Sequence, residues 1–272
     1  MACGRNLPNS ESDYTMNPIE QEIQQKLDAL QAEKNCRLLL AVESGSRAWG
    51  YASQDSDYDV RCIYYYPQER YLDVRLPRDT VEWELNEVFD ITGWELRKSL
   101  GLALKSNLTV FEWADSPIVY RTSPWHEEFR SVIRSVMQPR MLASRYLGMA
   151  ASTMHRYLQR DEVPYKQYFY ALRPLLAARW VMQELVPAPV PFADLRPLLP
   201  QEMQSVTDEL LALRNGSTEK ATGPAHPVAD AFIVRELAAL DAMLQNMPAP
   251  AEPDTAPLGS FFRSVVAAGQ SI

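Results

Sequence analysis

The sequence predicts an α+β protein in which a mixed sheet-and-helix part comes first and a helical part follows. Two observations support this class. Short apolar runs rich in β-branched and aromatic residues occur only before about residue 122, whereas later apolar residues recur at helical spacing. Proline-rich breaks separate the later helices. We therefore expect a disordered extension over 1–16, an α+β domain over 17–122 and a helical domain over 123–272.

The elements of the first part follow from residue spacing. Apolar residues at helical spacing predict an amphipathic helix over 18–31. Apolar runs bounded by turn residues predict buried strands at 37–42, 60–66 and 81–92. A helix is expected to begin at Gly93, because the leucines that follow it share one helical face.

The second part carries helical patterns and no strand pattern. We expect helices over 141–160, 165–185, 201–214 and 228–246. Pro174 should kink the second of these helices. A short apolar stretch at 258–268 follows a linker-like segment and is expected to dock back on the body.

Composition and charge narrow the classes of function. The chain has 272 residues, of which 46% are hydrophobic and 23% charged, as in an ordinary globular protein. No apolar run approaches the ~20 residues needed to cross a bilayer, and the amino terminus lacks a secretory h-region. The three widely spaced cysteines form neither a disulfide nor a zinc pattern, so we expect a cytoplasmic protein.

The net charge of −8 argues against tight binding of long nucleic acid through its backbone. The basic residues are not concentrated in one run. A nucleotide remains a suitable ligand, since it needs only a few well-placed cations and a metal.

The segment over 43–61, ESGSRAWGYASQDSDYDVR, carries the chemistry. A predicted strand runs into Gly45-Ser46, and ten residues later Asp57 and Asp59 begin the next strand. Alternate strand residues share a face, so the two carboxylates project together and repel one another unless a cation neutralises them. Mg²⁺ prefers such oxygen ligands, and a Gly-Ser turn offers N–H groups and a hydroxyl to a phosphate. Each feature alone is usually a plain turn or a solvated strand end; the ordered combination favours a phosphate–metal site.

This segment resembles the signature of the polymerase-beta-type nucleotidyltransferase superfamily, in which Gly-Ser is followed at similar distance by an Asp-x-Asp pair. More narrowly, SGSRAWGYASQDSDYDVR is similar to the predicted nucleotidyltransferases associated with RNA ligases in bacteria and phages. The likeness continues through FDITGWELRKSLGLALKSNLTVFEWADSP and YKQYFYALRPLLAARW, and so covers roughly residues 37–185. It implies a mixed-sheet nucleotidyltransferase domain followed by a helical domain.

The resemblance implies two Mg²⁺ ions and a third carboxylate on a later strand. Asp57 and Asp59 would hold the ion that binds the triphosphate, and the third carboxylate would complete the second ion's site. Asp90, at the end of an apolar stretch, fits the family pattern best. Glu82 and Glu84 are the alternatives, although their alternation with apolar residues also suits the solvated face of an edge strand.

The resemblance also implies residues that bind the nucleotide. Gly45, Ser46 and the neighbouring backbone would hold the departing phosphates. Arg47 would add positive charge there, and a surface ion pair is its equally weighted alternative.

The helical part should cover the nucleotide. Lys166, Tyr170 and Arg173 lie at i, i+4 and i+7, on one face of a predicted helix, and should face the same cleft as Asp57. Two cations flanking a tyrosine suit a triphosphate with a stacked base or sugar. The alternative is a core tyrosine between two solvated cationic stems.

The activity that these residues imply is transfer of a nucleoside monophosphate from a nucleoside triphosphate, such as ATP, to a hydroxyl, with release of pyrophosphate. The resemblance points to an RNA end as acceptor, in RNA repair, with an RNA ligase as a potential partner. Two alternatives stay open: transfer of AMP to a protein, as in toxin–antitoxin pairs, and a catalytically silent nucleotide sensor. The pattern specifies neither the base, the acceptor nor the oligomeric state.

Overall fold

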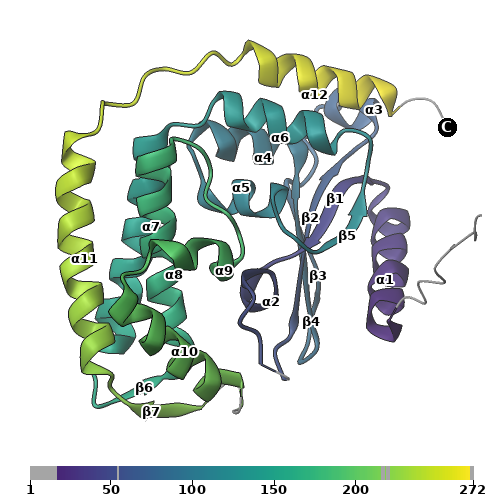
Figure 1. The fold of residues 1–272 in the computed structure, drawn as a ribbon. Coiled ribbons are helices and arrows are strands. Elements are labelled where there is room, and N and C mark those ends of the chain that lie inside the picture. Colours follow the sequence, from purple (N-terminus) through teal and green to yellow (C-terminus); the bar gives the residue numbers. More distant parts are fainter. Residues whose placement is uncertain (1–16, 54, 216–217, 219–220, 270–272) are drawn as a thin grey trace, which may run out of the picture.

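The fold has a sheet half and a helical half. The computed structural model describes residues 17–53, 55–215, 218 and 221–269, so the predicted extension at 1–16 lies outside the described residues. In Figure 1 the sheet stands between a single helix on one side and the helical half on the other, and the last helix lies at the top of the molecule, above α6.

One five-stranded mixed sheet forms the first half, in the order β3-β4-β2-β1-β5. The strands β2 and β4 are parallel, and the other neighbouring pairs are antiparallel. The bounds of the strands are β1 Arg37–Glu43, β2 Tyr58–Tyr65, β3 Thr80–Leu85, β4 Phe89–Glu95 and β5 Val119–Thr122. The predicted α+β class with a mixed sheet is confirmed.

The strand predicted over 81–92 is wrong as a single element, because the segment folds into the hairpin of β3 and β4. Asn86 causes the reversal: its side-chain Oδ1 accepts hydrogen bonds from the N–H groups of Val88 and Phe89, both at 2.8 Å. This Asx-type turn competes with continued extension. The hairpin brings β4 inside the sheet and leaves β3 at its edge.

Helices flank the sheet on both faces. The predicted helix over 18–31 is confirmed as α1, whereas the helix expected from Gly93 begins at Leu96. Gly93 belongs to β4, where a Cβ would lie 3.1 Å from the side chains of both Cys62 and Val81. The bounds in this half are α1 Pro18–Lys34, α2 Gly45–Trp49, α3 Gln68–Tyr71, α4 Leu96–Leu104, α5 Leu108–Ala114 and α6 His126–Ser135.

Each face of the sheet has its own core. Ile23, Leu27 and Leu30 of α1 are fully buried against one face. The other face packs on α4, α5 and the helical half in a single larger cluster. Burial on both faces explains why the central strands read as apolar runs rather than alternating patterns.

The helical half contains the predicted helices with two differences. The helix expected over 141–160 ends at Thr153 and continues as a π-helical turn. Two short strands also pair where none was expected. Helix α8 runs through Pro174. The bounds are α7 Pro139–Thr153, η1 Met154–Leu158, β6 Glu162–Pro164, α8 Tyr165–Glu184, α9 Phe192–Leu195, η2 Arg196–Leu198, α10 Gln201–Asn215, β7 Thr222–Pro224, α11 Pro227–Asn246 and α12 Ala256–Ala268.

The apolar stretch at 258–268 forms most of α12 and docks on the body, as predicted. Phe261 is 2% exposed and packs against Phe129 of α6, with ring centroids 6.1 Å apart. Among the described residues no helix is long and apolar enough to cross a membrane.

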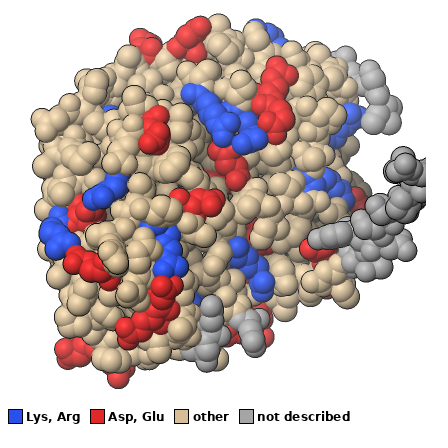
Figure 2. Space-filling model, viewed as in Figure 1, with Lys and Arg blue, Asp and Glu red and all other residues tan. Residues whose placement is uncertain are grey.

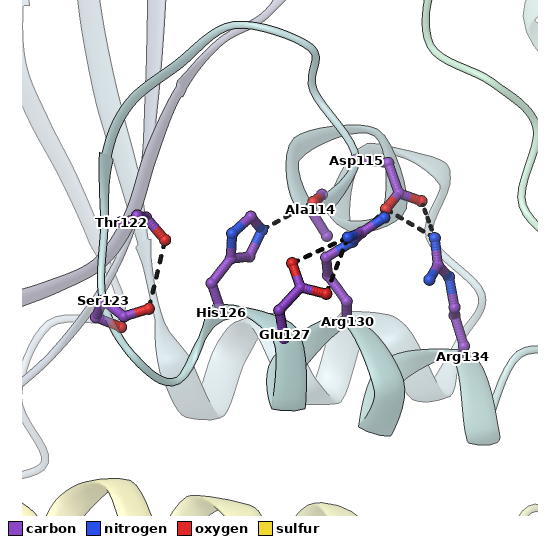
Figure 3. Close-up of polar contacts among 8 residues, drawn as sticks. All are labelled: Ala114, Asp115, Thr122, Ser123, His126, Glu127, Arg130 and Arg134. Carbon is purple, nitrogen blue, oxygen red and sulfur yellow. Dashed lines mark hydrogen bonds and ion pairs between the residues drawn. The ribbon is translucent and has the colours of Figure 1, made fainter. Parts of the chain in front are cut away.

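A polar cluster joins α5 to α6 (Figure 3). Asp115, which follows α5, accepts hydrogen bonds from Arg130 and Arg134 of α6. The His126 ring contacts the Ala114 carbonyl oxygen through Nε2 at 2.9 Å. These contacts fix the end of α5 against α6.

Candidate functional site

The turn between β1 and α2 requires glycine. Gly45 has a φ of +61°, a left-handed conformation that side chains rarely adopt. A Cβ at this position would also lie 2.2 Å from Asp59 Oδ2. The Ser44 N–H donates to the Asp59 carbonyl oxygen at 2.9 Å, and Ser46, 6% exposed, has its Oγ 3.4 Å from Ser56 Oγ. The Gly-Ser turn therefore lies directly against the second aspartate.

The parallel pairing of β2 with β4 places two carboxylates side by side. Asp59 of β2 is the register partner of Asp90 of β4. Their side chains are 25% and 24% exposed. Asp57 lies just before β2, and within the described part of the chain its carboxylate makes no hydrogen bond or ion pair. The structure thus brings Asp59 and Asp90 together, with Asp57 two residues away on the same strand path.

A cation that sequence analysis did not single out joins these carboxylates. Arg61 Nη2 donates to Asp59 Oδ1 at 2.5 Å and to Asp90 Oδ2 at 2.7 Å. Arg61 Nη1 donates to the Asp90 carbonyl oxygen at 2.6 Å. The available signal was the period of two, since residues 57, 59 and 61 of a strand share a face.

A second residue missed from the sequence supports Asp59 from behind. Glu43 is 1% exposed, and its Oε1 accepts a hydrogen bond from the Asp59 N–H at 2.9 Å. The Tyr120 hydroxyl donates to Glu43 Oε2. Burial raises the pKa of the Glu43 carboxyl to about 7, against the opposing effect of the hydrogen bond from Tyr120.

The geometry favours Asp90 over Glu82 or Glu84 as the third carboxylate. Asp90 shares Arg61 with Asp59, as described above. Glu84 instead accepts hydrogen bonds from Lys26 of α1 at 2.7 and 2.9 Å, on the face of the sheet that α1 covers. The assignment of Asp90 stays a prediction until ligand binding is measured.

Arg47 contacts backbone carbonyl oxygens rather than the surface carboxylate that was the alternative considered for it. Its Nε donates to the Asp57 carbonyl oxygen at 2.9 Å and its Nη2 to the Ser56 carbonyl oxygen at 2.5 Å. Its guanidinium also lies 3.8 Å from the centroid of the Tyr58 ring. Arg47 therefore anchors the backbone that carries Asp57, and its predicted contact with phosphate stays a prediction.

Helix α8 brings Tyr170 against α2, the helix that begins at Gly45. The Tyr170 ring packs edge-on against Trp49 of α2, with centroids 5.3 Å apart, and lies 6.2 Å from Tyr51. Lys166 is half-buried in the first turn of α8. Their predicted contact with a nucleotide stays a prediction.

Arg173 is enclosed, contrary to both positions that the sequence suggested. Its side chain is 1% exposed, and Nη1 donates to Glu112 Oε1 at 2.8 Å. Nε donates to the Val190 carbonyl oxygen at 2.8 Å, and the guanidinium lies 4.7 Å from the Trp49 ring centroid. A contact between Arg173 and a nucleotide would require this buried ion pair to open, because Glu112 and the Val190 carbonyl oxygen hold the guanidinium in the interior.

The predicted metal ligands are of the chemical type that Mg²⁺ binds, but their carboxylates are not gathered around one point. Asp57, Asp59 and Asp90 offer only oxygen ligands, which Mg²⁺ prefers, and Gly45 leaves room beside Asp59 Oδ2 that a side chain would fill. In the described residues no three His, Cys, Asp or Glu side chains are gathered closely enough to hold a metal ion. Arg61 occupies the position between Asp59 and Asp90 where a cation is required.

Charge on the visible face of the molecule is mixed. Figure 2 shows Lys and Arg side chains scattered singly or in small groups among Asp and Glu, without a continuous basic stripe. This distribution agrees with the net charge of −8 and gives no track for a long nucleic acid on that face.

Comparison with known proteins identifies relatives over most of the chain. Residues 19–264 match the family model RlaP, described as "RNA repair pathway DNA polymerase beta family". The Bacillus subtilis (strain 168) protein named "Uncharacterized protein YcgL" is 39% identical over 197 residues, covering 70% of this chain and 76% of that protein. A crystal structure of a nucleotidyltransferase-like protein from Exiguobacterium sibiricum 255-15 aligns over 92% of this chain and 80% of its own, at 12% identity and a TM-score of 0.30, too low to carry an argument.

Proposed function

Because this chain belongs to the RNA repair pathway DNA polymerase beta family, we propose that it transfers a nucleoside monophosphate from a nucleoside triphosphate to a hydroxyl group. The family supports an enzyme that carries out nucleotidyl transfer. We propose a nucleoside triphosphate as the donor, a hydroxyl group as the acceptor and Mg²⁺ as the metal.

One observation carries the proposal. The register of β2 and β4 places Asp59 beside Asp90, and Gly45 of the Gly-Ser turn lies against Asp59 Oδ2. This arrangement supports the proposal that the carboxylates of Asp59 and Asp90 hold the metal and that the adjacent Gly-Ser turn holds the phosphates.

Asp57, Asp59 and Asp90 would hold Mg²⁺. When bound, Mg²⁺ supplies positive charge to the phosphate oxygens and makes an acceptor hydroxyl easier to ionise. Glu43 and Arg47 keep the carboxylates in place through the backbone: Glu43 holds the Asp59 N–H, and Arg47 holds the Asp57 carbonyl oxygen.

The proposed transfer is a single displacement at the α-phosphorus. The acceptor oxygen forms a bond to the α-phosphorus, the bond from that phosphorus to the bridging oxygen of the β-phosphate breaks, and pyrophosphate leaves. The hydroxyl proton passes to solvent. Ser46 and the N–H groups of the turn after Gly45 would bind the leaving phosphates, while Asp57 and Asp59 orient the reacting end.

The helical half would cover the nucleotide. Tyr170 packs against Trp49 of α2, the helix that begins at the Gly-Ser turn, and in this proposal it would contact the base or sugar. Lys166 precedes Tyr170 by one helical turn and would contribute charge to the triphosphate. Arg173 would act from behind by positioning Trp49.

An RNA end is the acceptor that we propose, supported by the family's description as part of an RNA repair pathway. An RNA ligase that seals the modified end would be a fitting partner. A cytoplasmic location is likewise proposed, since Cys36 and Cys62 are buried free thiols.

Incubation with α-labelled nucleoside triphosphates tests the proposal. Each of the four triphosphates would be added with Mg²⁺ and either a short structured RNA or total cell protein. Label on RNA supports the proposal, and chelation by EDTA should abolish it. Label on protein alone would mean that the acceptor is a protein rather than RNA. If neither RNA nor protein is labelled and the nucleotide still binds, the protein is a catalytically silent nucleotide sensor.

A further inference from the structure

We propose that Arg61 is the resident counter-cation of the metal site, competing with the divalent metal for Asp59 and Asp90. The inference rests on the proposed function for the identity of the metal ligands. It assigns Arg61 a positioning role: the guanidinium holds the carboxylates in register before metal binds and releases them when it does.

The contacts of Arg61 separate into an anchor and a bridge. Nη1 donates to the Asp90 carbonyl oxygen at 2.6 Å, a backbone group outside the proposed set of metal ligands. Nη2 alone spans the carboxylates, at 2.5 Å from Asp59 Oδ1 and 2.7 Å from Asp90 Oδ2. The contacts of Nη2 can therefore break while the Nη1 hydrogen bond keeps the guanidinium beside Asp90.

The site needs a cation at this point whether or not a metal is present. Asp59 and Asp90 are register partners on neighbouring strands, and their side chains are only about a quarter exposed. Like charges this close in a partly desolvated site disfavour one another. The single positive charge of Arg61 offsets one of the two negative charges and contacts both carboxylates, which lets the metal-free protein keep them adjacent.

The three carboxylates differ in what a metal must displace. Asp59 Oδ2 faces Gly45, away from the oxygen that Arg61 contacts. The Asp57 carboxylate has no partner among the described residues. An ion that binds Asp59 Oδ1 or Asp90 Oδ2 must therefore displace Nη2 of Arg61, whereas binding to Asp57 displaces no contact of Arg61 with a carboxylate.

Metal binding without nucleotide tests the inference. The dissociation constant of Mn²⁺, a spectroscopic substitute for Mg²⁺, would be measured by electron paramagnetic resonance for wild type, Arg61→Gln and Arg61→Lys. Arg61→Gln should bind Mn²⁺ about tenfold more tightly, since a unit charge a few ångströms from a divalent ion changes its affinity by this factor even at the dielectric constant of water. Arg61→Lys keeps the charge without the bridge and should lie between the two.

Thermal melting gives a second readout. Without metal, Arg61→Gln should melt below wild type, because two carboxylates lose their counter-charge, and Mn²⁺ should raise its Tm more than that of wild type. Arg121→Gln is the matched control: Arg121 pairs with Asp28 of α1, on the other side of the sheet, and its loss should leave Mn²⁺ affinity unchanged.

The outcomes separate this inference from the proposed function. Mn²⁺ binding that Asp57→Asn weakens, but that Arg61→Gln leaves unchanged or also weakens, would overturn the counter-cation role and leave the proposed function standing. Absence of Mn²⁺ binding from every form would overturn both. If Arg61→Gln does not fold, an affinity of Arg61→Lys no tighter than wild type overturns the inference.

Discussion

The sheet half and the helical half each contain an arginine that neutralises carboxylate, in very different surroundings. Arg61 is 15% exposed and bridges two aspartates that are each about a quarter exposed. Arg173 is 1% exposed and pairs with Glu112, which is 6% exposed. The first pair can exchange its cation with solvent, whereas the second is closed on all sides.

The difference in burial predicts different roles. A buried pair gains little net stability from forming, yet removing one partner leaves an uncompensated charge that cannot be solvated. A partly exposed pair can lose one partner at low cost, because water or an ion takes its place. We therefore expect the Arg173–Glu112 pair to serve the stability of the fold, and the contacts of Arg61 with Asp59 and Asp90 to exchange with a bound ion.

The largest expected effect is on catalysis. Asp57→Asn should lower nucleotidyl transfer at least about a thousandfold, since each ligand of a catalytic metal contributes several kcal/mol and ~1.4 kcal/mol is tenfold in rate. Its melting temperature should stay at or slightly above that of wild type, because the Asp57 carboxylate has no partner among the described residues to lose. Transfer assays with labelled nucleotide and thermal melting measure the two effects.

Glu82→Gln is the control for that variant and should transfer nearly as well as wild type. Asp90→Asn should lose transfer as Asp57→Asn does. Wild-type transfer by Asp57→Asn would falsify the catalytic assignment. Retained transfer by Asp90→Asn alone would instead move the third carboxylate to β3.

The buried pair should show the opposite balance. Arg173→Met should lower the free energy of unfolding by about 3–5 kcal/mol, because Glu112 is left buried without its cation. Replacing both, as Arg173→Met with Glu112→Leu, should recover much of that loss. Urea unfolding measures each value.

Arg235→Met supplies the matched exposed case. Arg235 pairs with Glu202 at 3.3 Å, with side chains 65% and 61% exposed, so its loss should cost less than ~1 kcal/mol. If Arg173→Met costs no more than Arg235→Met, the contrast between the two halves is wrong.

Glu43 extends the comparison to a buried carboxylate that is held by hydrogen bonds alone. Its pKa is raised by burial to about 7 from a model-peptide value of 4.5, so the folded state keeps a proton that the unfolded state releases in this window. The stability that Glu43 contributes is present below pH 4.5 and is lost as pH rises to about 7. The loss should be on the order of 3 kcal/mol.

Urea unfolding of wild type and Glu43→Gln at pH 4.5 to 8 measures this pH-dependent part of the free energy of unfolding, because the glutamine variant should lack it. Tyr120→Phe removes a donor that lowers the pKa of Glu43, so its loss of stability should extend to higher pH. Identical pH profiles for wild type and Glu43→Gln would show that the carboxyl titrates as in the unfolded chain.

The segment from Gly45 to Asp59 was predictable because its residues are close in sequence and have few alternative explanations. Local patterns also predicted α1, the mixed sheet and the docking of α12. The β3–β4 hairpin was not predicted, because one Asn86 side chain reverses an otherwise continuous apolar pattern. The contact of Arg61 with Asp90 and that of Arg173 with Glu112 join residues 29 and 61 positions apart, which no local pattern shows.

The smallest expected effect concerns the space beside Asp59. Gly45 and Gly50 both have positive φ, +61° and +86°, so alanine at either should cost about 1–2 kcal/mol of backbone strain. Only at Gly45 would the new Cβ meet a carboxylate, 2.2 Å from Asp59 Oδ2, while nothing lies within 4 Å at Gly50. Gly45→Ala should therefore lose more stability than Gly50→Ala, and it alone should weaken Mn²⁺ binding, because Asp59 must turn away. Equal Mn²⁺ affinities in the two variants would show that Asp59 Oδ2 takes no part in the metal site, and would confine the exchange of cations to the oxygens that Arg61 already contacts.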